Sequence, residues 1–310
     1  MSSLHAFGAY LPECVVGNAE LAARLGCTAE WIESASGIRE RRWADDKTGI
    51  ADLAERAAAD CLTRAGTPAS QVGLLILASG SAPPGFPAPG AAVAARLGLN
   101  TTPVIDLPVA SAGSLFGLAL AAQLAETYGD VLVVAAEKMS AIIQAHPLDR
   151  NTAMLFGDGA GAALVSKRPG PWQILNHALH SDGQFAADLS YDGRSALRMN
   201  GLSVILQASR KLPAVIQEVL ERARVPAADV STFLLHQANQ NLLARVGKAL
   251  GVAPDRIFSN IARYGNTSSA SMLIAAAEWS AQSAPAGPVV FAAFGAGLHW
   301  GALVASASRG

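Results

Sequence analysis

Apolar runs rich in leucine, valine and isoleucine recur along the chain, and turn-forming residues bound each of them. Short runs of this kind are typical of strands that are buried on both faces of a sheet. The pattern predicts strands at Val72–Ala78, Pro103–Asp106, Asp130–Ala136, Ala160–Val165, Thr232–Leu235, Val289–Phe294 and Ala302–Ala305.

Longer stretches with apolar residues at helical spacing separate these runs. They predict helices at Thr48–Ala65, Ala91–Leu97, Ser111–Thr127, Leu197–Ala223, Gln240–Leu250 and Ser269–Gln282. The alternation of buried strands and helices indicates an α/β protein in which helices and sheets are layered. The stretch 169–198, with scattered Gly, Pro and Asp, is interpreted as an irregular link.

Two segments about half the chain apart have the same order of elements. LLILASGS and FLLHQANQ each lead an apolar strand into small or polar residues and then a helix. This similarity hints at an internal duplication, although strand-to-helix turns occur in any α/β protein. We expect two halves, residues 1–168 and 169–310, packed into one body because no low-complexity linker separates them.

The composition narrows the classes of partner. Of the 310 residues, 51% are apolar, and 23 basic side chains nearly balance 24 acidic ones, so no global field would hold nucleic acid or an acidic membrane. The start of the chain lacks a basic segment followed by a long apolar one, and no apolar run reaches the roughly 20 residues that a membrane span needs. We therefore expect a cytoplasmic protein.

The cysteines give no sign of a metal site. Cys14, Cys27 and Cys61 lack metal-ligand spacing, and their odd number suggests a reducing compartment. We interpret all three as buried or incidental.

The segment SAGSLFGLALAAQLAE, which begins at Ser111, carries small or apolar residues nearly all round its first turns. Such a composition is typical of a helix that is buried on every side. Serine is a favoured N-cap residue, so a hydroxyl at this position needs no catalytic role.

Three further segments place polar residues or glycines at strand ends or helix starts, namely HQAN at 236–239, YGNTS at 264–268 and FGAG at 294–297. Ligands bind at that edge of α/β proteins because helix N-termini and free backbone donors point there. A lone histidine or asparagine there is usually a satisfied buried group, but the combination favours a functional site.

In order and separation, the motifs DLPVASAG, FGDGAGA, HQAN, YGNTSSAS and FGAGLHWGA resemble those of the ketoacyl synthase III family of the thiolase superfamily. GIRER near residue 40 extends the resemblance to almost the whole chain, and the pair HQAN and YGNTS is its most specific part. The resemblance implies a thiolase-like fold, a duplicated five-layer αβαβα sandwich. It also implies an acyltransferase that condenses an acyl-coenzyme A with a malonyl thioester, with loss of carbon dioxide.

The same resemblance implies roles at the site. His236 and Asn266 would bind the malonyl thioester carbonyl and stabilise its enolate. Two N–H donors that converge on one oxygen form an oxyanion site, and loss of one such donor commonly costs about 3 kcal/mol. The backbone N–H groups of Ser111 and of the loop containing Gly295 and Gly297 would form a second oxyanion site, for the acyl group, where glycine permits close approach.

Residues further out are also implied. Trp31 and Arg150 match the positions that sandwich the adenine of coenzyme A, although Trp31 also suits the apolar anchor of an amphipathic turn. Arg39 and Arg41 are candidates for binding the nucleotide phosphates, while a charge run is usually a solvated face. Phe86, in GFPAPG, matches a loop that bounds the acyl pocket across a dimer interface, which implies a homodimer.

No metal or redox cofactor is implied. Asp158, in FGDGAGA, is interpreted as fixing a turn through backbone N–H groups rather than as a catalytic residue. After HQAN, Gln240 and Asn241 stand where better-known members have a basic residue that helps to dock acyl carrier protein. Arg245 and Lys248 lie further along the same predicted helix, so both malonyl-acyl carrier protein and malonyl-coenzyme A remain open as extender substrates.

Ser111 departs from the family pattern, which has a cysteine there. A thiol at a helix N-terminus has a lowered pKa and forms a thioester that a carbon nucleophile attacks, whereas serine forms a less electrophilic ester. Three explanations are open: an engineered replacement, a natural acyl transferase that uses Ser111 with His236 as base, or a protein that only decarboxylates. Retention of His236 and Asn266 favours the first. The alternative from another class is a non-catalytic subunit that binds acyl-coenzyme A.

Overall fold

The computed structural model describes residues 2–282 and 287–307. In this part of the chain, the main sheet has nine strands in the order β11-β12-β13-β8-β1-β7-β6-β4-β5. The strands in this order span Thr232–Leu235, Pro288–Gly295, His299–Ala307, Trp172–Ser181, Ser3–Tyr10, Asp158–Ser166, Asp130–Lys138, Val72–Ala78 and Val104–Leu107. Strand β4 is parallel to β5 and β6, β11 is parallel to β12, and the other neighbours are antiparallel.

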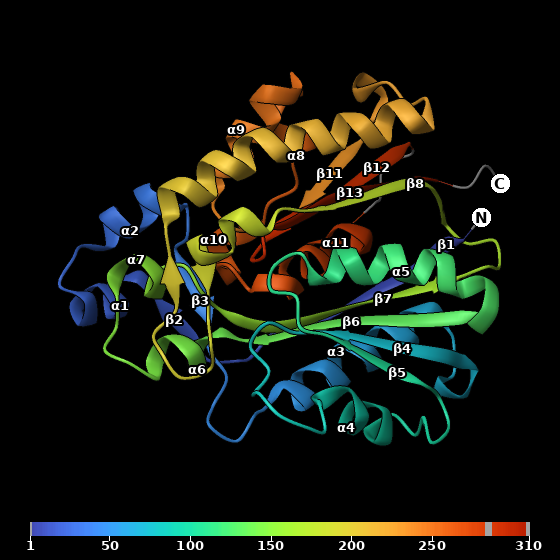
Figure 1. The fold of residues 1–310 in the computed structure, drawn as a ribbon, viewed down its shortest axis with the longest axis horizontal. Coiled ribbons are helices and arrows are strands. Elements are labelled where there is room, and N and C mark those ends of the chain that lie inside the picture. The colour runs from blue at the N-terminus through green and yellow to red at the C-terminus, as the bar shows by residue number, and fades with distance from the viewer. Residues whose placement is uncertain (1, 283–286, 308–310) are drawn as a thin grey trace.

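The helices divide this sheet into layers, as Figure 1 shows. Helices α8 and α9 cover the part formed by β11, β12, β13 and β8, and helices α3 and α4 cover the outer face of the other five strands. Helices α5 and α11 lie between the two parts. The expected five-layer αβαβα arrangement is therefore confirmed. The helices are α3 (Ile50–Ala65), α4 (Pro89–Arg96), α5 (Gly113–Tyr128), α8 (Gly201–Ala223), α9 (Gln240–Leu250) and α11 (Ser271–Ala281).

Every strand of the main sheet that precedes residue 169 lies on one side of the β1–β8 contact, and every later strand lies on the other. This order follows the expected halves, but helix α11 of the second half packs against β1 and β7 of the first. The division into halves at residue 168 therefore stays a prediction. Within the described residues, no helix has both the length and the apolar composition that crossing a membrane requires.

The expectation of an irregular link at 169–198 is wrong, because ten-residue strand β8 lies inside it. Strand β8 also carries Gln173, Asn176 and His177, and most of its residues are only half-buried. A search for unbroken apolar runs therefore misses it. Strand β5 was expected to be buried on both faces but forms the edge of the sheet, where Ile105 is partly exposed.

A smaller lobe lies at one end of the sheets, on the left of Figure 1, and has its own apolar core. It contains β2 (Val15–Gly17), α1 (Asn18–Leu25), α2 (Ala29–Ser36), β3 (Glu40–Arg42), α6 (Met139–Gln144) and α7 (Arg150–Ala153). The remaining short elements are β9 (Leu189–Ser190), β10 (Arg198–Met199), α10 (Ile261–Tyr264) and the 3-10 turns Ala69–Gln71, Gly183–Asp188, Ala227–Asp229, Pro254–Arg256 and Ser268–Ala270.

Arg41 joins parts of this lobe and is fully buried. One guanidinium nitrogen donates to the Val16 carbonyl (3.2 Å) and to Asn18 Oδ1 (2.8 Å), and the other donates to the Met154 carbonyl (2.7 Å). Burial lowers the pKa of Arg41 to about 10, so it stays charged at neutral pH. The suggestion that Arg41 binds phosphates or belongs to a solvated face is wrong, because its side chain is enclosed by protein.

Replacing Arg41 by methionine is expected to lower the free energy of unfolding by about 3 kcal/mol, because three buried acceptors lose their donor. Chemical denaturation measures this change. Arg39→Met is the matched control, since the Arg39 side chain is 73% exposed, and it should alter stability by about 0.5 kcal/mol or less. Equal effects of the two substitutions would contradict a structural role for Arg41.

Candidate functional site

Ser111 lies in the turn between β5 and α5, with a left-handed backbone φ of 63°. The helix begins at Gly113 with Ala112 as its N-cap, so the interpretation of Ser111 as the N-cap residue is wrong. The first turns of α5 are buried, as its composition indicates, although Leu120 further along is partly exposed. A left-handed backbone is uncommon for a residue with a side chain, and the surrounding structure must hold it in place.

The end of strand β12 packs directly against this turn. A Cβ atom on Gly295 would lie 2.2 Å from the Ala110 carbonyl oxygen and 2.8 Å from Ser111 Cβ, so only glycine fits. Gly297, two residues later, has a φ of +134° and lies beneath the ring of His299. Gly295 thus contacts the Ser111 turn, and Gly297 lines one cavity together with Ser111.

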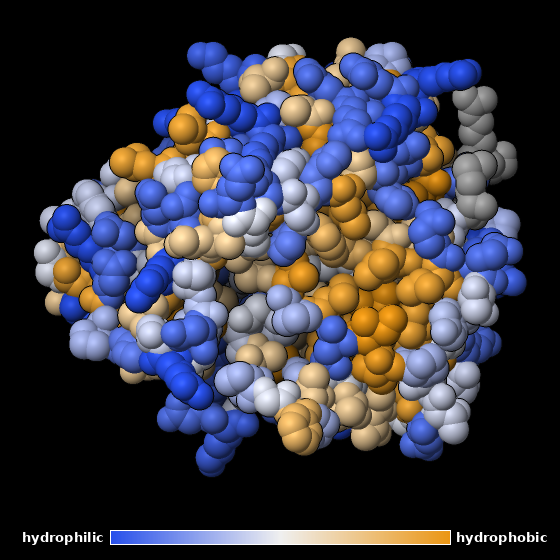
Figure 2. Space-filling model, in the orientation of Figure 1, coloured by the Kyte–Doolittle hydropathy of each residue, from blue (hydrophilic) through white to orange (hydrophobic). Residues whose placement is uncertain are grey.

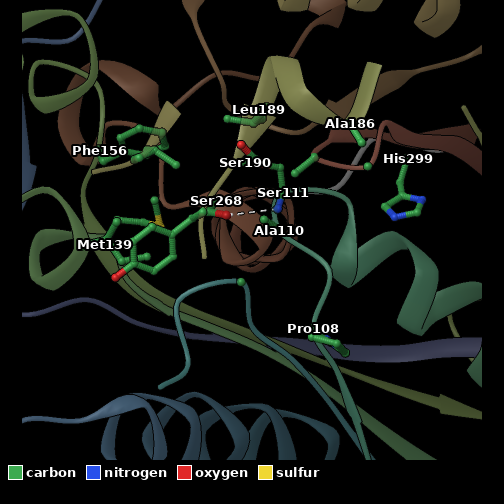
Figure 3. A pocket seen from close by; sticks show the side chains of 16 residues that line it. Pro108, Ala110, Ser111, Met139, Phe156, Ala186, Leu189, Ser190, Ser268 and His299 are labelled. Atoms are coloured by element: carbon green, nitrogen blue, oxygen red, sulfur yellow. Dashed lines mark hydrogen bonds between the residues drawn. The ribbon is translucent and has the colours of Figure 1, made fainter. Parts of the chain in front are cut away.

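The backbone N–H of Ser111 already has a partner, since it donates to Ser268 Oγ at 3.0 Å (Figure 3). The resemblance assigns this N–H to the oxyanion site of the acyl group. An acyl oxygen that binds there has to replace the Ser268 hydroxyl. The Ser111 hydroxyl itself has no hydrogen-bond partner among the described residues.

His236 follows strand β11 and is buried. Its Nδ1 atom lies 2.6 Å from Ser271 Oγ, which also accepts the backbone N–H of Gln237 at 3.0 Å. The Ser271 hydroxyl hydrogen is therefore free to be donated to Nδ1, which leaves the imidazole hydrogen on Nε2. Burial lowers the pKa of His236 to about 4. At neutral pH this side chain is an uncharged donor and a weak base.

Asn266 is oriented by its neighbours in the same way. Its Oδ1 accepts the backbone N–H of Ser268 at 2.8 Å, so the amide Nδ2 points the other way. Its backbone N–H donates to the Leu155 carbonyl at 2.8 Å, and its carbonyl accepts from Gly157 at 3.0 Å. Within the described part of the chain, neither Asn266 Nδ2 nor His236 Nε2 has a hydrogen-bond partner.

Ser111 lines two adjoining cavities. The first, the His236 cavity, is about 90 Å³ and is lined by His236, Asn266, Gly295 and apolar residues of helix α8. The second, the His299 cavity, is about 320 Å³ and appears in Figure 3. It is lined by Gly80, Pro108, Ala110, Ser111, Met139, Ile142, Phe156, Ala186, Leu189, Ser190, Tyr191, Leu197, Ser268, Ala296, Gly297 and His299. A group attached to Ser111 can extend into the larger cavity while a second molecule approaches through the smaller one.

Glu137, near the end of β6, is fully buried. Its carboxylate accepts the backbone N–H groups of Gly80 (3.0 Å) and Ser81 (2.8 Å) and the N–H and hydroxyl of Ser269 (3.2 and 2.6 Å). The hydroxyls of Ser79 and Ser81 complete its set of donors. Glu137 thus fixes the segment 266–271 to the loop after β4.

The residues expected to bind coenzyme A lie outside the two cavities. Arg150 stacks on Trp31, with its guanidinium carbon 5.4 Å from the ring centroid. Arg39 forms an exposed ion pair with Glu33 at 2.7 Å. The structure therefore brings Trp31 and Arg150 together and leaves Arg39 paired with an acidic side chain.

Phe86 is 98% exposed and lines neither cavity. Asp158 does bind backbone N–H groups, but those of Ser140 (2.8 Å) and Ala44 (2.8 Å) in other segments rather than of its own turn. Burial raises the pKa of Asp158. Cys14, Cys27 and Cys61 are free and line neither cavity.

Reasoning from the sequence missed four residues that shape the site. Ser268 and Ser271 lie within the quoted YGNTSSAS motif, where hydroxyls interrupt an alanine-rich helix start. Glu137 is an acidic residue at the end of an apolar strand, and His299 is the polar residue in FGAGLHWGA. Each of these polar residues is visible in the sequence, but the sequence does not show which residues it contacts in the fold.

Comparisons with known proteins agree with this geometry. A family model described as 3-oxoacyl-[acyl-carrier-protein (ACP)] synthase III matches residues 105–183, which include Ser111. A second model, described as the C terminal of 3-oxoacyl-[acyl-carrier-protein (ACP)] synthase III, matches residues 220–307, which include His236 and Asn266.

Individual relatives match over nearly their full lengths. The chain is 35% identical over 300 residues to β-ketoacyl-[acyl-carrier-protein] synthase III 1 of Halalkalibacterium halodurans, covering 96% of this chain and 95% of that protein. It is 32% identical over 302 residues to β-ketoacyl-[acyl-carrier-protein] synthase III of Staphylococcus aureus, covering 96% of each.

Solved structures give the same result. The 3-oxoacyl-[acyl-carrier-protein] synthase III of Aquifex aeolicus superimposes with a TM-score of 0.94 at 32% identity, covering 99% of this chain and 100% of that one. The priming β-ketosynthase of the R1128 polyketide biosynthetic pathway superimposes with a TM-score of 0.92 at 30% identity, covering 100% and 97%.

The low pKa of His236 predicts how stability depends on pH. The unfolded chain binds a proton at this residue below about pH 6.5, while the folded chain does so only near its pKa of about 4. Stability is therefore lost as the pH falls through this interval, by about 1.4 kcal/mol per pH unit for one proton. His236→Gln should lack this part of the loss when unfolding is followed at several pH values. Parallel pH profiles for the two proteins would contradict a depressed pKa.

Proposed function

This chain belongs to the 3-oxoacyl-[acyl-carrier-protein] synthase III family, and on that premise we propose that its site is built for decarboxylative Claisen condensation of an acyl-coenzyme A with a malonyl thioester. The chain is accordingly an acyltransferase of the β-ketoacyl synthase III type. The observation that carries the proposed reaction is that His236 Nε2 and Asn266 Nδ2, two donors without a partner among the described residues, line one cavity with Ser111.

The first half of the reaction is transfer of the acyl group to residue 111. Its side-chain atom attacks the thioester carbonyl, and coenzyme A leaves as the thiol with the proton that residue 111 gives up. Backbone N–H groups of Ser111 and of the loop containing Gly295 and Gly297 are the donors available for the tetrahedral oxyanion. The close packing of Gly295 on Ser111 supports this arrangement.

The second half takes place in the His236 cavity. The malonyl thioester carbonyl accepts hydrogen bonds from His236 Nε2 and Asn266 Nδ2, carbon dioxide leaves, and the two donors stabilise the enolate oxygen. The enolate carbon then attacks the acyl carbonyl. A carbon–carbon bond forms, the bond from residue 111 to the acyl carbon breaks, and the released side chain takes up a proton from water.

Ser111 is the residue of the proposed site that is least suited to condensation. A hydroxyl needs a base to become a nucleophile, but His236 holds its proton on Nε2 and has a pKa of about 4. That observation weighs against the alternative in which Ser111 and His236 act as nucleophile and base of an acyl transferase. We therefore infer that this is a condensing site in which Ser111 stands in place of the nucleophilic cysteine.

The remaining assignments complete the proposal. Trp31 and Arg150 hold the adenine of coenzyme A, with Arg39 near its phosphates, and Phe86 reaches the acyl pocket of a partner subunit in a homodimer. The extender is malonyl-acyl carrier protein or malonyl-coenzyme A, no cofactor, nucleic acid or membrane takes part, and the protein works in the cytoplasm. The placement of Arg150 beside Trp31 and the exposure of Phe86 support these roles, and the Arg150 guanidinium has to move off the Trp31 ring to admit an adenine between them.

Ser111→Cys is expected to raise the condensation rate by about a hundredfold or more, since a thiol at this position is more acidic and yields a more reactive acyl intermediate. Intact-protein mass and peptide mapping report acylation, and the ketoacyl product reports condensation.

In the Ser111→Cys background, Asn266→Ala should keep acylation and lower the condensation rate about 100- to 1000-fold. If the serine protein turns over to an acceptor and the cysteine variant gains nothing, the condensing function is wrong.

Arg150→Ala in the Ser111→Cys background is expected to raise the KM for acetyl-coenzyme A about three- to tenfold, because the adenine loses a cationic stacking partner. The acetyl thioester of N-acetylcysteamine lacks the nucleotide and is the control substrate, whose KM should not change. A similar rise for both substrates would show that Arg150 acts on the site rather than on the nucleotide.

A further inference from the structure

The glycine loop, residues 295–298, leads from β12 into β13 and is held at its far end by residues at the end of β8. Asp182, directly after β8, exchanges two backbone hydrogen bonds with Leu298, at 2.8 and 3.0 Å. The Oγ atom of Ser181 lies 2.7 Å from Nδ1 of His299, the first residue of β13. The position of the glycine loop therefore depends on the position of Asp182.

Asp182 also holds part of the wall of the His299 cavity. Its Oδ1 atom caps the turn Gly183–Asp188 by accepting the backbone N–H of Gln184 at 3.2 Å. Ala186, inside this turn, lines the cavity. One aspartate thus joins the glycine loop to a wall of the cavity that Ser111 also lines.

Lys211, on helix α8, contacts Asp182 and two aromatic rings. Its Nζ atom donates to Asp182 Oδ2 at 2.9 Å and lies 4.0 Å from the centroid of the Trp300 ring and 5.5 Å from that of Phe185. Trp300 belongs to β13, two residues after Leu298, and Phe185 belongs to the capped turn. A cation that binds a carboxylate and also lies over aromatic rings is restrained in several directions. Lys211 therefore connects α8 to the glycine loop and to the capped turn.

Lys211 is more buried than its neighbour on the same helix. The surface over α8 is largely hydrophilic (Figures 1 and 2), and Arg210 is exposed there. The side chain of Lys211 is only 19% exposed, and that of Asp182 is 25% exposed. Solvent screens a partly buried ion pair less than an exposed one. This pair is therefore better suited to hold a loop in place than an ion pair on the surface.

We propose that Lys211 is a positioning residue for acyl transfer to residue 111, and that it acts by holding the glycine loop against the Ser111 turn. This inference rests on the condensing function proposed above, in which backbone N–H groups of the loop stabilise the tetrahedral oxyanion. A small displacement of such a donor slows the reaction, because the donor no longer points at the developing charge.

The donors for the malonyl thioester are held by other residues. Ser271 Oγ lies 2.6 Å from His236 Nδ1. The backbone N–H of Ser268 donates to Asn266 Oδ1 at 2.8 Å. Neither contact involves Lys211 or the glycine loop, so loss of Lys211 should slow acylation and spare decarboxylation.

The test replaces Lys211 by methionine in the Ser111→Cys protein, which keeps a long side chain and removes its charge. Intact-protein mass at saturating acetyl-coenzyme A gives the rate constant of acylation, and release of carbon dioxide from malonyl-coenzyme A gives that of decarboxylation. We expect acylation to slow about tenfold and decarboxylation to stay unchanged. Lys211→Arg keeps the charge and should restore most of the acylation rate. Arg210→Met is the matched control on the same helix and should change neither rate.

Asp182→Asn is a second variant, which decides the question if Lys211→Met does not fold. It weakens the bond to Lys211 and keeps the shape of the side chain, so we expect acylation to slow about threefold. Equal losses in acylation and decarboxylation, or acylation that neither variant slows, would overturn the inference while leaving the condensing function intact. If the Ser111→Cys protein itself neither acylates nor condenses, the proposed function has failed instead.

Discussion

The buried carboxylate of Glu137 is the constraint on which the site depends. Among the residues that the structure describes, no cation forms an ion pair with it, and backbone N–H groups and hydroxyls from two distant segments satisfy it instead. A buried charge is stable only when its hydrogen bonds are complete, so both segments are held where Glu137 can reach them. One of them, 266–271, contains Asn266 itself, Ser268, which binds the Ser111 N–H, and Ser271, which orients His236.

Hydrogen bonds also decide what each group of the site can do. Ser271 fixes which nitrogen of His236 carries the hydrogen, and burial keeps the ring neutral. Ser268 fixes the amide of Asn266 so that its donor side stays free. The result is a pair of oriented donors in one cavity with Ser111. Under the proposed function, serine in place of cysteine at position 111 changes the nucleophile and leaves these two donors unchanged.

Small residues make the close contacts of the site possible. Gly295 lets the end of β12 touch the Ser111 turn, and Gly297 accommodates the ring of His299. These contacts join the two parts of the sheet at Ser111, which lies on the wall of both cavities. Ser111 can therefore be approached from two cavities.

The sequence alone determined the α/β class, the exact bounds of β4, β11 and α9, and the candidate set of Ser111, His236 and Asn266. The class and the bounds follow from local periodicity, and the candidate set follows from short motifs that resemble those of the ketoacyl synthase III family. Only the tertiary structure decided that β8 is a central strand, that Arg41 is buried, and that the Ser111 N–H is already bonded to Ser268. Each of these depends on contacts between residues far apart in the chain, and the side chain that satisfies a buried polar group there cannot be read from the pattern of its own neighbours.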